Sequence, residues 1–464
     1  MRKIVSRGRF VPRSGQDAFQ VLMDETDLRR LSDITEPGFF QRIRDTYKDG
    51  KKKKLVENFF SLSLLQGINY LLPFITLPYL TRVLGVGNFG LVMFAQAFIQ
   101  YFIMFTDYGF NLSATREIAV NRENIDRISE IFSAVLFIKM ILTVFGFAVL
   151  CLIVFAVDKF SSEWMLYLFT YGIVIGYTLF PVWLFQGMER MKYITLLSIA
   201  AKLVFTVSIF IVIRERSDFL YVPVLNSLGF ILAGILGIWI AIKRFRVRFL
   251  WPCWSNLRNR MTDGFHIFAT SFLPQLYNSS TTFILGLLTN HVLVGYYAAA
   301  AKVVDALNSI IYVISQTFFP YLNRQLSSHK SFRNIIIGTG LVLSAIIFWK
   351  AELLVNIIFG SEYAESIMLL RILAFCPLFV ATIVCYGTNY LLIIKEDKLY
   401  LRITMISSII GFSAAWVLIP LLAQTGAGLN LLFSRALLGL LTLAFAVRFI
   451  KREAHQKSQV AAVT

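Results

Sequence analysis

Long apolar segments recur along the chain and are separated by short polar ones. The apolar segments lie at 57–80, 88–112, 129–157, 164–187, 193–213, 219–242, 263–289, 294–320, 334–349, 364–394, 403–421 and 427–447. Each is near or above the ~20 residues that a helix needs to cross the hydrocarbon core of a membrane. Backbone groups find no water there, so each segment is predicted to be helical. The pattern predicts an all-α integral membrane protein with about 12 transmembrane helices.

Lys and Arg are distributed asymmetrically between the polar segments. Fourteen precede residue 56, and 21 more lie in the loops expected on the same side and at the C-terminus. The opposite loops hold only five, which are Arg82, Lys159, Arg214, Arg216 and Lys350. By the positive-inside rule, both termini are predicted to be cytoplasmic.

Composition narrows the class further. The chain is 57% hydrophobic and 16% charged, with a net charge of +18. In a soluble protein this charge would suggest nucleic acid, but here it lies in loops where anionic membrane lipids are the expected partner. The four Cys form no CxxC pair and the four His are scattered. Neither a disulfide framework nor a metal site is expected.

The predicted helices divide into two sets of six. We expect a polar cytoplasmic extension without fixed structure at 1–55, an N-lobe at 56–242, a basic cytoplasmic linker at 243–262, a C-lobe at 263–450 and a cytoplasmic tail at 451–464. The turn Val86-Gly87-Asn88-Phe89 is echoed by Val294-Gly295-Tyr296-Tyr297 in the second half. Two such lobes around a central cavity are a transporter architecture.

Five cations fall inside the apolar segments: Lys139, Lys202, Lys302, Arg371 and Arg435. A Lys or Arg at the centre of a membrane helix costs about 2.5–3.5 kcal/mol. These side chains should therefore face a hydrated cavity or a counter-charge. Asp305 is the one carboxylate near mid-depth. An excess of interior cations over interior anions predicts an anionic cargo.

The competing interpretations of the five cations differ from one residue to the next. Lys139 and Lys202 have no acidic neighbour within a helical turn, so we expect both to line a hydrated cavity. Lys302 shares a helix face with Asp305 at i,i+3, and a structural pair is an alternative there. For Arg371 and Arg435, extension of the side chain to the outer membrane surface competes with a cavity role.

Three further charged residues are gate candidates. Arg82 follows Pro78 at the outer end of the first predicted helix, where it forms an outer gate or anchors the helix end. Asp107 and Arg116 bracket the inner end of the second predicted helix, where a gate pair competes with local loop stabilisation. Asp305 is the candidate for coupling to an H⁺ or Na⁺ gradient. No cofactor is expected.

Six stretches carry a resemblance to Wzx-type O-antigen and polysaccharide flippases. They are NYLLPFITLPYLTRVLG (69–85), NFG (88–90), DYGFNLSATREIA (107–119), PVWLFQGMERM (181–191), DGFHIF (263–268) and FGSEY (359–363). The resemblance implies membership of the multidrug/oligosaccharidyl-lipid/polysaccharide exporter superfamily. Its members are similar in having two six-helix lobes that rock around a central cavity.

The same resemblance implies a cargo and a location. The cargo would be an oligosaccharide repeat unit on undecaprenyl pyrophosphate, moved from the cytoplasmic to the periplasmic leaflet of the bacterial inner membrane for polysaccharide biosynthesis. A polysaccharide polymerase and a chain-length regulator would be protein partners.

Three rival functions are weighed against this prediction. A membrane-bound polysaccharide polymerase or glycosyltransferase would carry catalytic residues in sizeable outer loops, whereas the outer loops here are short and lack phosphate-binding or nucleophile motifs. A multidrug exporter of the same superfamily would favour interior carboxylates for cationic drugs. A lipid II-type flippase matches the quoted motifs less well. We therefore expect no enzymatic activity.

Overall fold

The computed structural model describes residues 50–463. Side chains in this range are described except for most of those before Phe74, most between residues 255 and 279, those after Arg452, and Pro320 and Ser327. The predicted polar extension therefore lies outside the described residues as far as residue 49.

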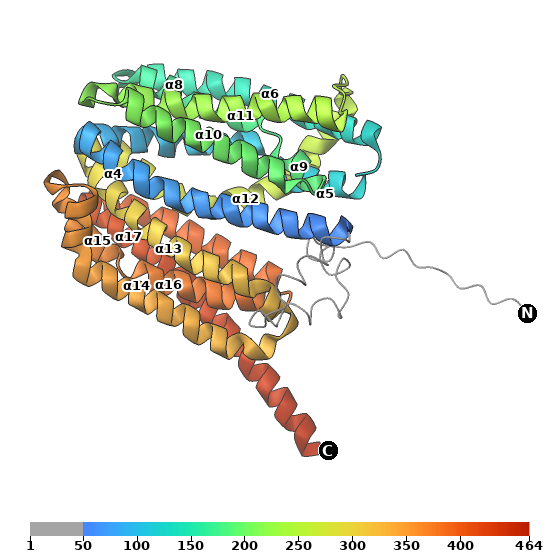
Figure 1. The fold of residues 1–464 in the computed structure, drawn as a ribbon. Helices are drawn as coiled ribbons and strands as arrows, with labels where there is room; N and C mark the ends of the chain where they lie inside the picture. The colour runs from blue at the N-terminus through green and yellow to red at the C-terminus, as the bar shows by residue number, and fades with distance from the viewer. Residues whose placement is uncertain (1–49, 464) are drawn as a thin grey trace, which may run out of the picture.

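Two bundles of helices lie side by side along a common direction (Figure 1). The first, which we call the N-lobe, contains α4 (Gly50–Asp107), α5 (Phe110–Val120), α6 (Ile125–Ala156), α7 (Asp158–Ser161), α8 (Trp164–Leu179), α9 (Val182–Gly187), α10 (Met191–Val212), the 3₁₀ helix η2 (Arg216–Leu220) and α11 (Tyr221–Phe245). The second, the C-lobe, contains α12 (Trp254–Leu288), α13 (His291–Arg324), η3 (Leu326–Ser328), α14 (His329–Ile358), η4 (Ser361–Tyr363), α15 (Glu365–Leu373), α16 (Cys376–Thr382), the π-helix η5 (Ile383–Leu391) and α17 (Asp397–Val463). The predicted all-α fold with two lobes is confirmed.

The two ends of the bundle differ in charge. One end carries α5, α9 and the basic connection between α11 and α12, and we call it the basic end (right in Figure 1). The other carries α7, η2 and η4, and we call it the short-loop end.

Nine helical stretches in the described part of the chain, each made of one or more consecutive helices, are long and apolar enough to cross a membrane. The helices α4 and α17 each hold two predicted segments, because α4 bends at Gly85 (φ 73°) and α17 at Ala423 (φ 48°). The predicted segment 263–289 corresponds to α12, a 35-residue helix that is not among the nine. The arrangement is therefore compatible with twelve crossings.

Two predicted boundaries differ from the structure. The segment 364–394 is broken into α15, α16 and η5, because Pro377 cannot donate a backbone hydrogen bond and starts a new helix. The widened turn of η5 is held by Asn389, whose Nδ2 donates to the Val384 carbonyl at 3.0 Å. In addition, α14 continues through Lys350 to Ile358, beyond the predicted end of the segment 334–349.

The outward surface of both lobes is apolar. Val144, Leu152 and Leu421 are each about 70% exposed (71%, 69% and 73%) on helices of the spanning set. In a soluble protein so much exposed apolar surface would favour aggregation, whereas lipid chains would cover it here. The lobes thus form a multi-pass membrane protein.

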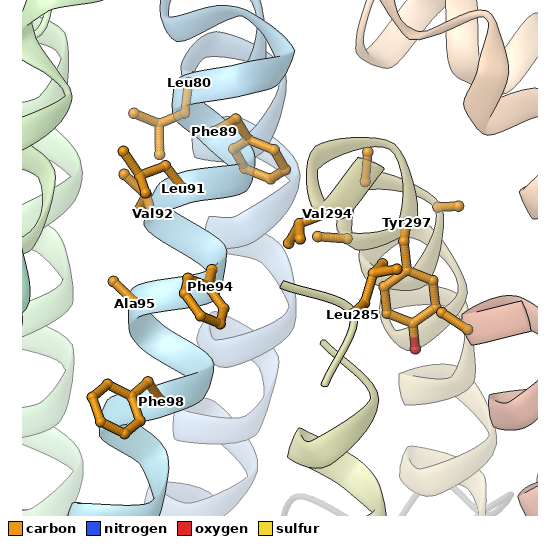
Figure 2. Close-up of a cluster of buried hydrophobic side chains, with 14 of the residues drawn as sticks. Leu80, Phe89, Leu91, Val92, Phe94, Ala95, Phe98, Leu285, Val294 and Tyr297 are labelled. Carbon is orange, nitrogen blue, oxygen red and sulfur yellow. The ribbon is translucent and has the colours of Figure 1, made fainter. Parts of the chain in front are cut away.

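The lobes touch most closely where α4 crosses α13. A Cβ atom on Gly90 would lie 1.8 Å from the His291 carbonyl oxygen, and one on Gly295 would lie 2.2 Å from the Val86 carbonyl oxygen. Only glycine allows the two backbones to approach so closely. Aromatic rings continue the contact further along α4. Phe94 and Phe98 of this helix lie in the same buried cluster as residues of α12 and α13 (Figure 2).

The variant Gly90→Ala should destabilise the protein by about 1–3 kcal/mol, because its methyl group overlaps the α13 backbone. Thermal unfolding of the purified protein measures the effect. Gly338→Ala is the matched control, since a Cβ there meets nothing within 4 Å in the helix α14. An equal melting temperature for both variants would contradict the close contact.

Candidate functional site

At the short-loop end, α4 is bonded to the end of α14 across the two lobes. The Arg82 guanidinium donates to the carbonyl oxygen of Ile357, in the last turn of α14. Beside it the Tyr363 hydroxyl donates to the Thr81 carbonyl oxygen at 3.3 Å. Arg82 thus bonds a helix end that belongs to the other lobe, and its role as an outer gate stays a prediction.

An ion pair bridges the same end. Arg216 of η2 donates to the carboxylate of Glu362 in η4. The Asn88 side chain donates to the Arg216 carbonyl oxygen at 2.7 Å and fixes the backbone of this residue. Both charged side chains remain about half exposed or more, at 66% and 49%.

A third contact at this end involves Lys159 of α7. Its Nζ donates to the carbonyl oxygens of Leu287 (2.8 Å) and Thr289 (2.6 Å), which end α12. The last carbonyls of a helix lack intrahelical partners and carry its negative dipole end, so a cation is favourable there. Partial burial lowers the pKa of the Lys159 ammonium group. We call the contacts of Arg82, Lys159, Arg216 and Tyr363 the short-loop bridges.

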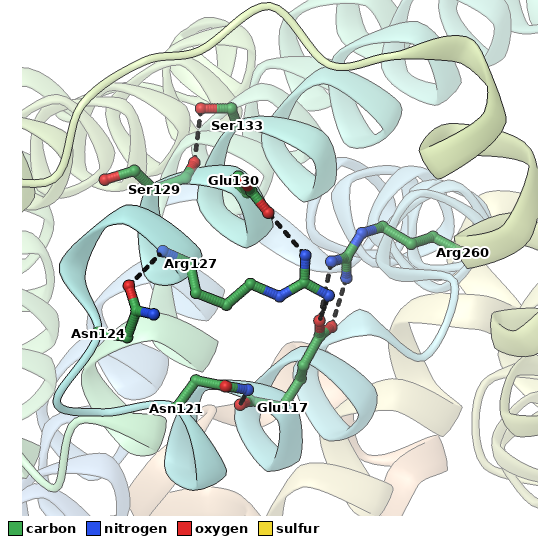
Figure 3. A network of polar contacts seen from close by, with 8 residues as sticks. All are labelled: Glu117, Asn121, Asn124, Arg127, Ser129, Glu130, Ser133 and Arg260. Atoms are coloured by element: carbon green, nitrogen blue, oxygen red, sulfur yellow. Dashed lines mark hydrogen bonds and ion pairs between the residues drawn. The ribbon is translucent and has the colours of Figure 1, made fainter.

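At the basic end, Glu117 of α5 binds two arginines (Figure 3). The Arg260 guanidinium, in the first turns of α12, donates to both carboxylate oxygens at 2.5 and 2.9 Å. Arg127 of α6 lies 3.3 Å from the same carboxylate and also pairs with Glu130 at 2.6 Å. Glu117 thereby joins the start of the C-lobe to the N-lobe. Sequence reasoning missed this residue, although it lies within the quoted motif 107–119.

Lys139 is almost sealed inside the N-lobe, with 3% exposure. Its Nζ lies 3.3 Å from Oδ1 of Asp107 at the end of α4. The expected position in the wall of a hydrated cavity does not match this burial, because Lys139 is enclosed beside Asp107. This pairing also changes the proposed Asp107–Arg116 gate pair, because Asp107 pairs with Lys139 while Arg116 is exposed on α5.

Lys202 lies on the inward face of α10. Thr195 and Ile209, seven residues away on either side, are buried, whereas Leu203 and Val204 are exposed. Seven residues are close to two helical turns, so Lys202 shares the buried row and is itself half-buried. It does not face lipid.

Lys302 is exposed on α13, about a third of the way along this 34-residue helix. It stands seven residues after Gly295 and hence on the same face of the helix, the face that touches α4. A Lys at this depth cannot be left among acyl chains without a large cost. Lys302 is therefore exposed on the side of α13 that faces the N-lobe.

Asp305 pairs with Arg435 of α17, at 2.8 Å between Oδ1 and Nη2. The expected alternative partner was Lys302, on the same helix. The Arg435 side chain is 11% exposed, whereas that of Asp305 is 55% exposed. Arg435 is therefore held inside the C-lobe and not extended to a membrane surface, while its counter-charge remains accessible.

Arg371 differs from the other four cations. It is exposed on α15, and Met368 and Phe375, one turn to either side, are also exposed, at 61% and 48%. An apolar exposed face is typical of contact with lipid. This placement favours the alternative in which Arg371 extends along the lipid face towards the headgroups.

In fold, the chain is similar to solved transporters of the MOP superfamily. An inward-facing multidrug resistance MATE family transporter has a TM-score of 0.62 and 15% identity, over 85% of this chain and 98% of that one. Lipid II flippase MurJ, in an inward closed conformation, has a TM-score of 0.61 and 13% identity, over 85% of this chain and 87% of that one. The chain shares the fold of these two proteins.

Sequence comparison defines the family. The family model described as "Polysaccharide biosynthesis protein" matches residues 55–326, more than half of the chain. A protein of Escherichia coli (strain K12) named "Putative O-antigen transporter" is 31% identical over 85% of this chain and 97% of its own length. One of the same name from Shigella dysenteriae is 26% identical over 83% and 98%. The chain belongs to the polysaccharide biosynthesis protein family, and its relatives and structural neighbours are transporters and flippases, not enzymes.

The variant Asp107→Asn should destabilise the protein by about 3–5 kcal/mol, because it leaves the buried Lys139 ammonium group without a counter-charge. Combining it with Lys139→Met should restore most of the stability, since no buried charge remains. Chemical unfolding of the purified variants in detergent measures both. If the double variant is no more stable than Asp107→Asn, the pair is not the reason for the loss.

Proposed function

We propose that this protein is a flippase for oligosaccharide repeat units linked to undecaprenyl pyrophosphate. It moves them from the cytoplasmic to the periplasmic leaflet of the bacterial inner membrane, for O-antigen or related polysaccharide biosynthesis. The family, the relatives named as O-antigen transporters and the similarity in fold to a lipid II flippase support this proposal. In this orientation the basic end is cytoplasmic and the short-loop end periplasmic.

The observation that carries the proposal is the position of Lys302. It is an exposed cation within a spanning helix, on the face that meets the other lobe at Gly295. A pyrophosphate and its glycan cannot cross ~30 Å of hydrocarbon without a substitute for their hydration. Lys302 supplies part of that substitute, while the polyprenyl chain remains in lipid.

Arg435 and Lys202 are the second and third cations assigned to cargo binding. Arg435 is engaged by Asp305, whose carboxylate is the accessible member of the pair. A proton or Na⁺ bound at Asp305 would weaken the ion pair and release Arg435 towards an anionic headgroup. Asp305 therefore remains the coupling candidate. Lys139 is assigned to the stability of the N-lobe, and Arg371 to the lipid face.

Alternating access requires that the lobes separate at one end while they remain joined at the other. The short-loop bridges join them at the predicted periplasmic end. The Glu117–Arg260 pair joins the N-lobe to α12 at the predicted cytoplasmic end. We assign the two sets as the contacts that break in turn when cargo is released and when it enters. Binding of a polysaccharide polymerase or a chain-length regulator remains a prediction.

Lys302→Ala should lower transport by about tenfold to 100-fold, because a charge-assisted bond to the cargo is worth about 1.5–3 kcal/mol. The assay is surface polysaccharide in a strain that lacks the chromosomal gene, at matched protein levels. Arg371→Ala is the control, an exposed cation that we assign to the lipid face, and should retain transport. Wild-type polymer with Lys302→Ala, or equal loss in both variants, would reject the assignment.

A crosslink between Cys at positions 216 and 362 should block transport, because it prevents the lobes from separating at the short-loop end. The variant Arg216→Cys/Glu362→Cys is treated with a short, cleavable bis-thiol reagent after Cys151 and Cys253 are replaced by Ser. Cleavage of the reagent should restore transport. Each single variant, treated in the same way, controls for modification of one side. Full transport in the crosslinked protein would show that this end does not open.

A further inference from the structure

The connection between the lobes is fixed along α6. The Arg248 backbone N–H donates to Ser129 Oγ at 3.0 Å, and the Leu250 N–H donates to Ser133 Oγ at 2.8 Å. Both serines are 0% exposed. Residues one turn apart on a helix are separated by about 6 Å along its axis, close to the spacing of alternate residues in an extended chain. We call residues 246–252, which are not helical, the strap.

The strap runs from the basic end towards the membrane interior. Helix α6 starts at the basic end, and Ser129, Ser133 and Phe137 lie on its successive turns. Arg248 contacts the first of these and Leu250 the second. Trp251 then packs against Phe137, with ring centroids 5.9 Å apart. The cation thus lies nearer the aqueous end and the indole deeper.

The charged side chains of the strap and its flanking residues are all positive, and all are exposed. Residues 243–254 contain no Asp or Glu, and Lys243, Arg244, Arg246 and Arg248 are all exposed. Trp251 and Trp254 are 83% and 75% exposed. Cations beside indole rings at the end of spanning helices match the headgroup region, where phosphates meet the first carbons of the chains.

We propose that the strap is a docking surface for anionic phospholipids of the leaflet at the basic end. Arg246 and Arg248 bind the headgroup phosphates, and Trp251 and Trp254 insert below them. A soluble acidic partner would satisfy the cations but would leave the indoles, which lie level with a spanning helix, uncovered. The surface is built on α6 of the N-lobe, whereas Lys302 belongs to α13 of the C-lobe, so the proposal is separate from cargo binding.

The two serines give this surface a fixed geometry, which a net positive charge alone does not provide. Because Ser129 and Ser133 hold the strap backbone, the cations and indoles keep one spacing relative to α6. Bound lipid would then anchor the N-lobe at a fixed depth, and the C-lobe would move against it. Loss of the serine hydroxyls should weaken lipid binding although every charge remains.

The test measures binding of phosphatidylglycerol and phosphatidylcholine to the full-length protein in detergent, by native mass spectrometry. Arg246→Gln/Arg248→Gln should weaken phosphatidylglycerol binding about 30-fold, since each cation near a membrane surface is worth ~1 kcal/mol. Ser129→Ala/Ser133→Ala should weaken it about fivefold, the effect expected from loss of roughly one net hydrogen bond. The control Lys398→Gln/Arg402→Gln, which removes two exposed cations from α17, should change it less than about twofold.

Two results would overturn the proposal. The first is equal loss in the strap and control charge variants, which would mean that only net charge attracts the lipid. The second is unchanged binding in the serine variant. If that variant does not fold, Trp251→Ala/Trp254→Ala replaces it, because both rings are exposed. Unchanged affinity there would equally exclude the strap. Transport enters none of these measurements, so they remain valid if the proposed cargo is wrong.

Discussion

The backbone contact between α4 and α13 determines where the charged residues of both lobes lie. Gly90 and Gly295 let the two helices touch, and no larger residue fits without moving a carbonyl group. One turn earlier, α4 bends at Gly85, which brings Arg82 to the end of α14. Two turns later along α13, Lys302 occupies the same face. The position of Lys302, which we propose binds cargo, and that of a bridge at the short-loop end thus follow from one contact.

The cations that depart from the basic asymmetry have a structural reason. The loops of the short-loop end contain few Lys and Arg, yet Arg82, Lys159 and Arg216 each bond a residue of the C-lobe. A positive charge is disfavoured during insertion on the translocated side, which we propose is the short-loop end. Retention of three such charges at one interface is understandable if they hold the lobes together there. The count of Lys and Arg in the loops therefore contained a signal for these contacts, and sequence reasoning did not use it.

The sequence was sufficient for the all-α membrane-spanning fold, because hydropathy acts along a single helix, and the quoted motifs were sufficient for the class of transporter. It was insufficient for Lys139, because the partner Asp107 lies 32 residues away on a helix that only packing brings near. The environment of Arg435 could not be predicted for the same reason, since its partner Asp305 belongs to another helix. Arg371 could not be separated from Lys302 by depth alone. The exposed residues one turn to either side distinguish them, and exposure is a property of the packed bundle.

Exposed and buried ion pairs differ in the free energy needed to break them, and this difference fits the proposed motion. The Arg216–Glu362 pair is largely exposed, and such pairs contribute about 0–1 kcal/mol, so thermal energy suffices to exchange it for water. The Lys139–Asp107 pair contains a cation that is 4% exposed, and breaking a pair of that kind costs about 3–5 kcal/mol. The N-lobe can therefore move as a unit while the bridges at its rim open and close.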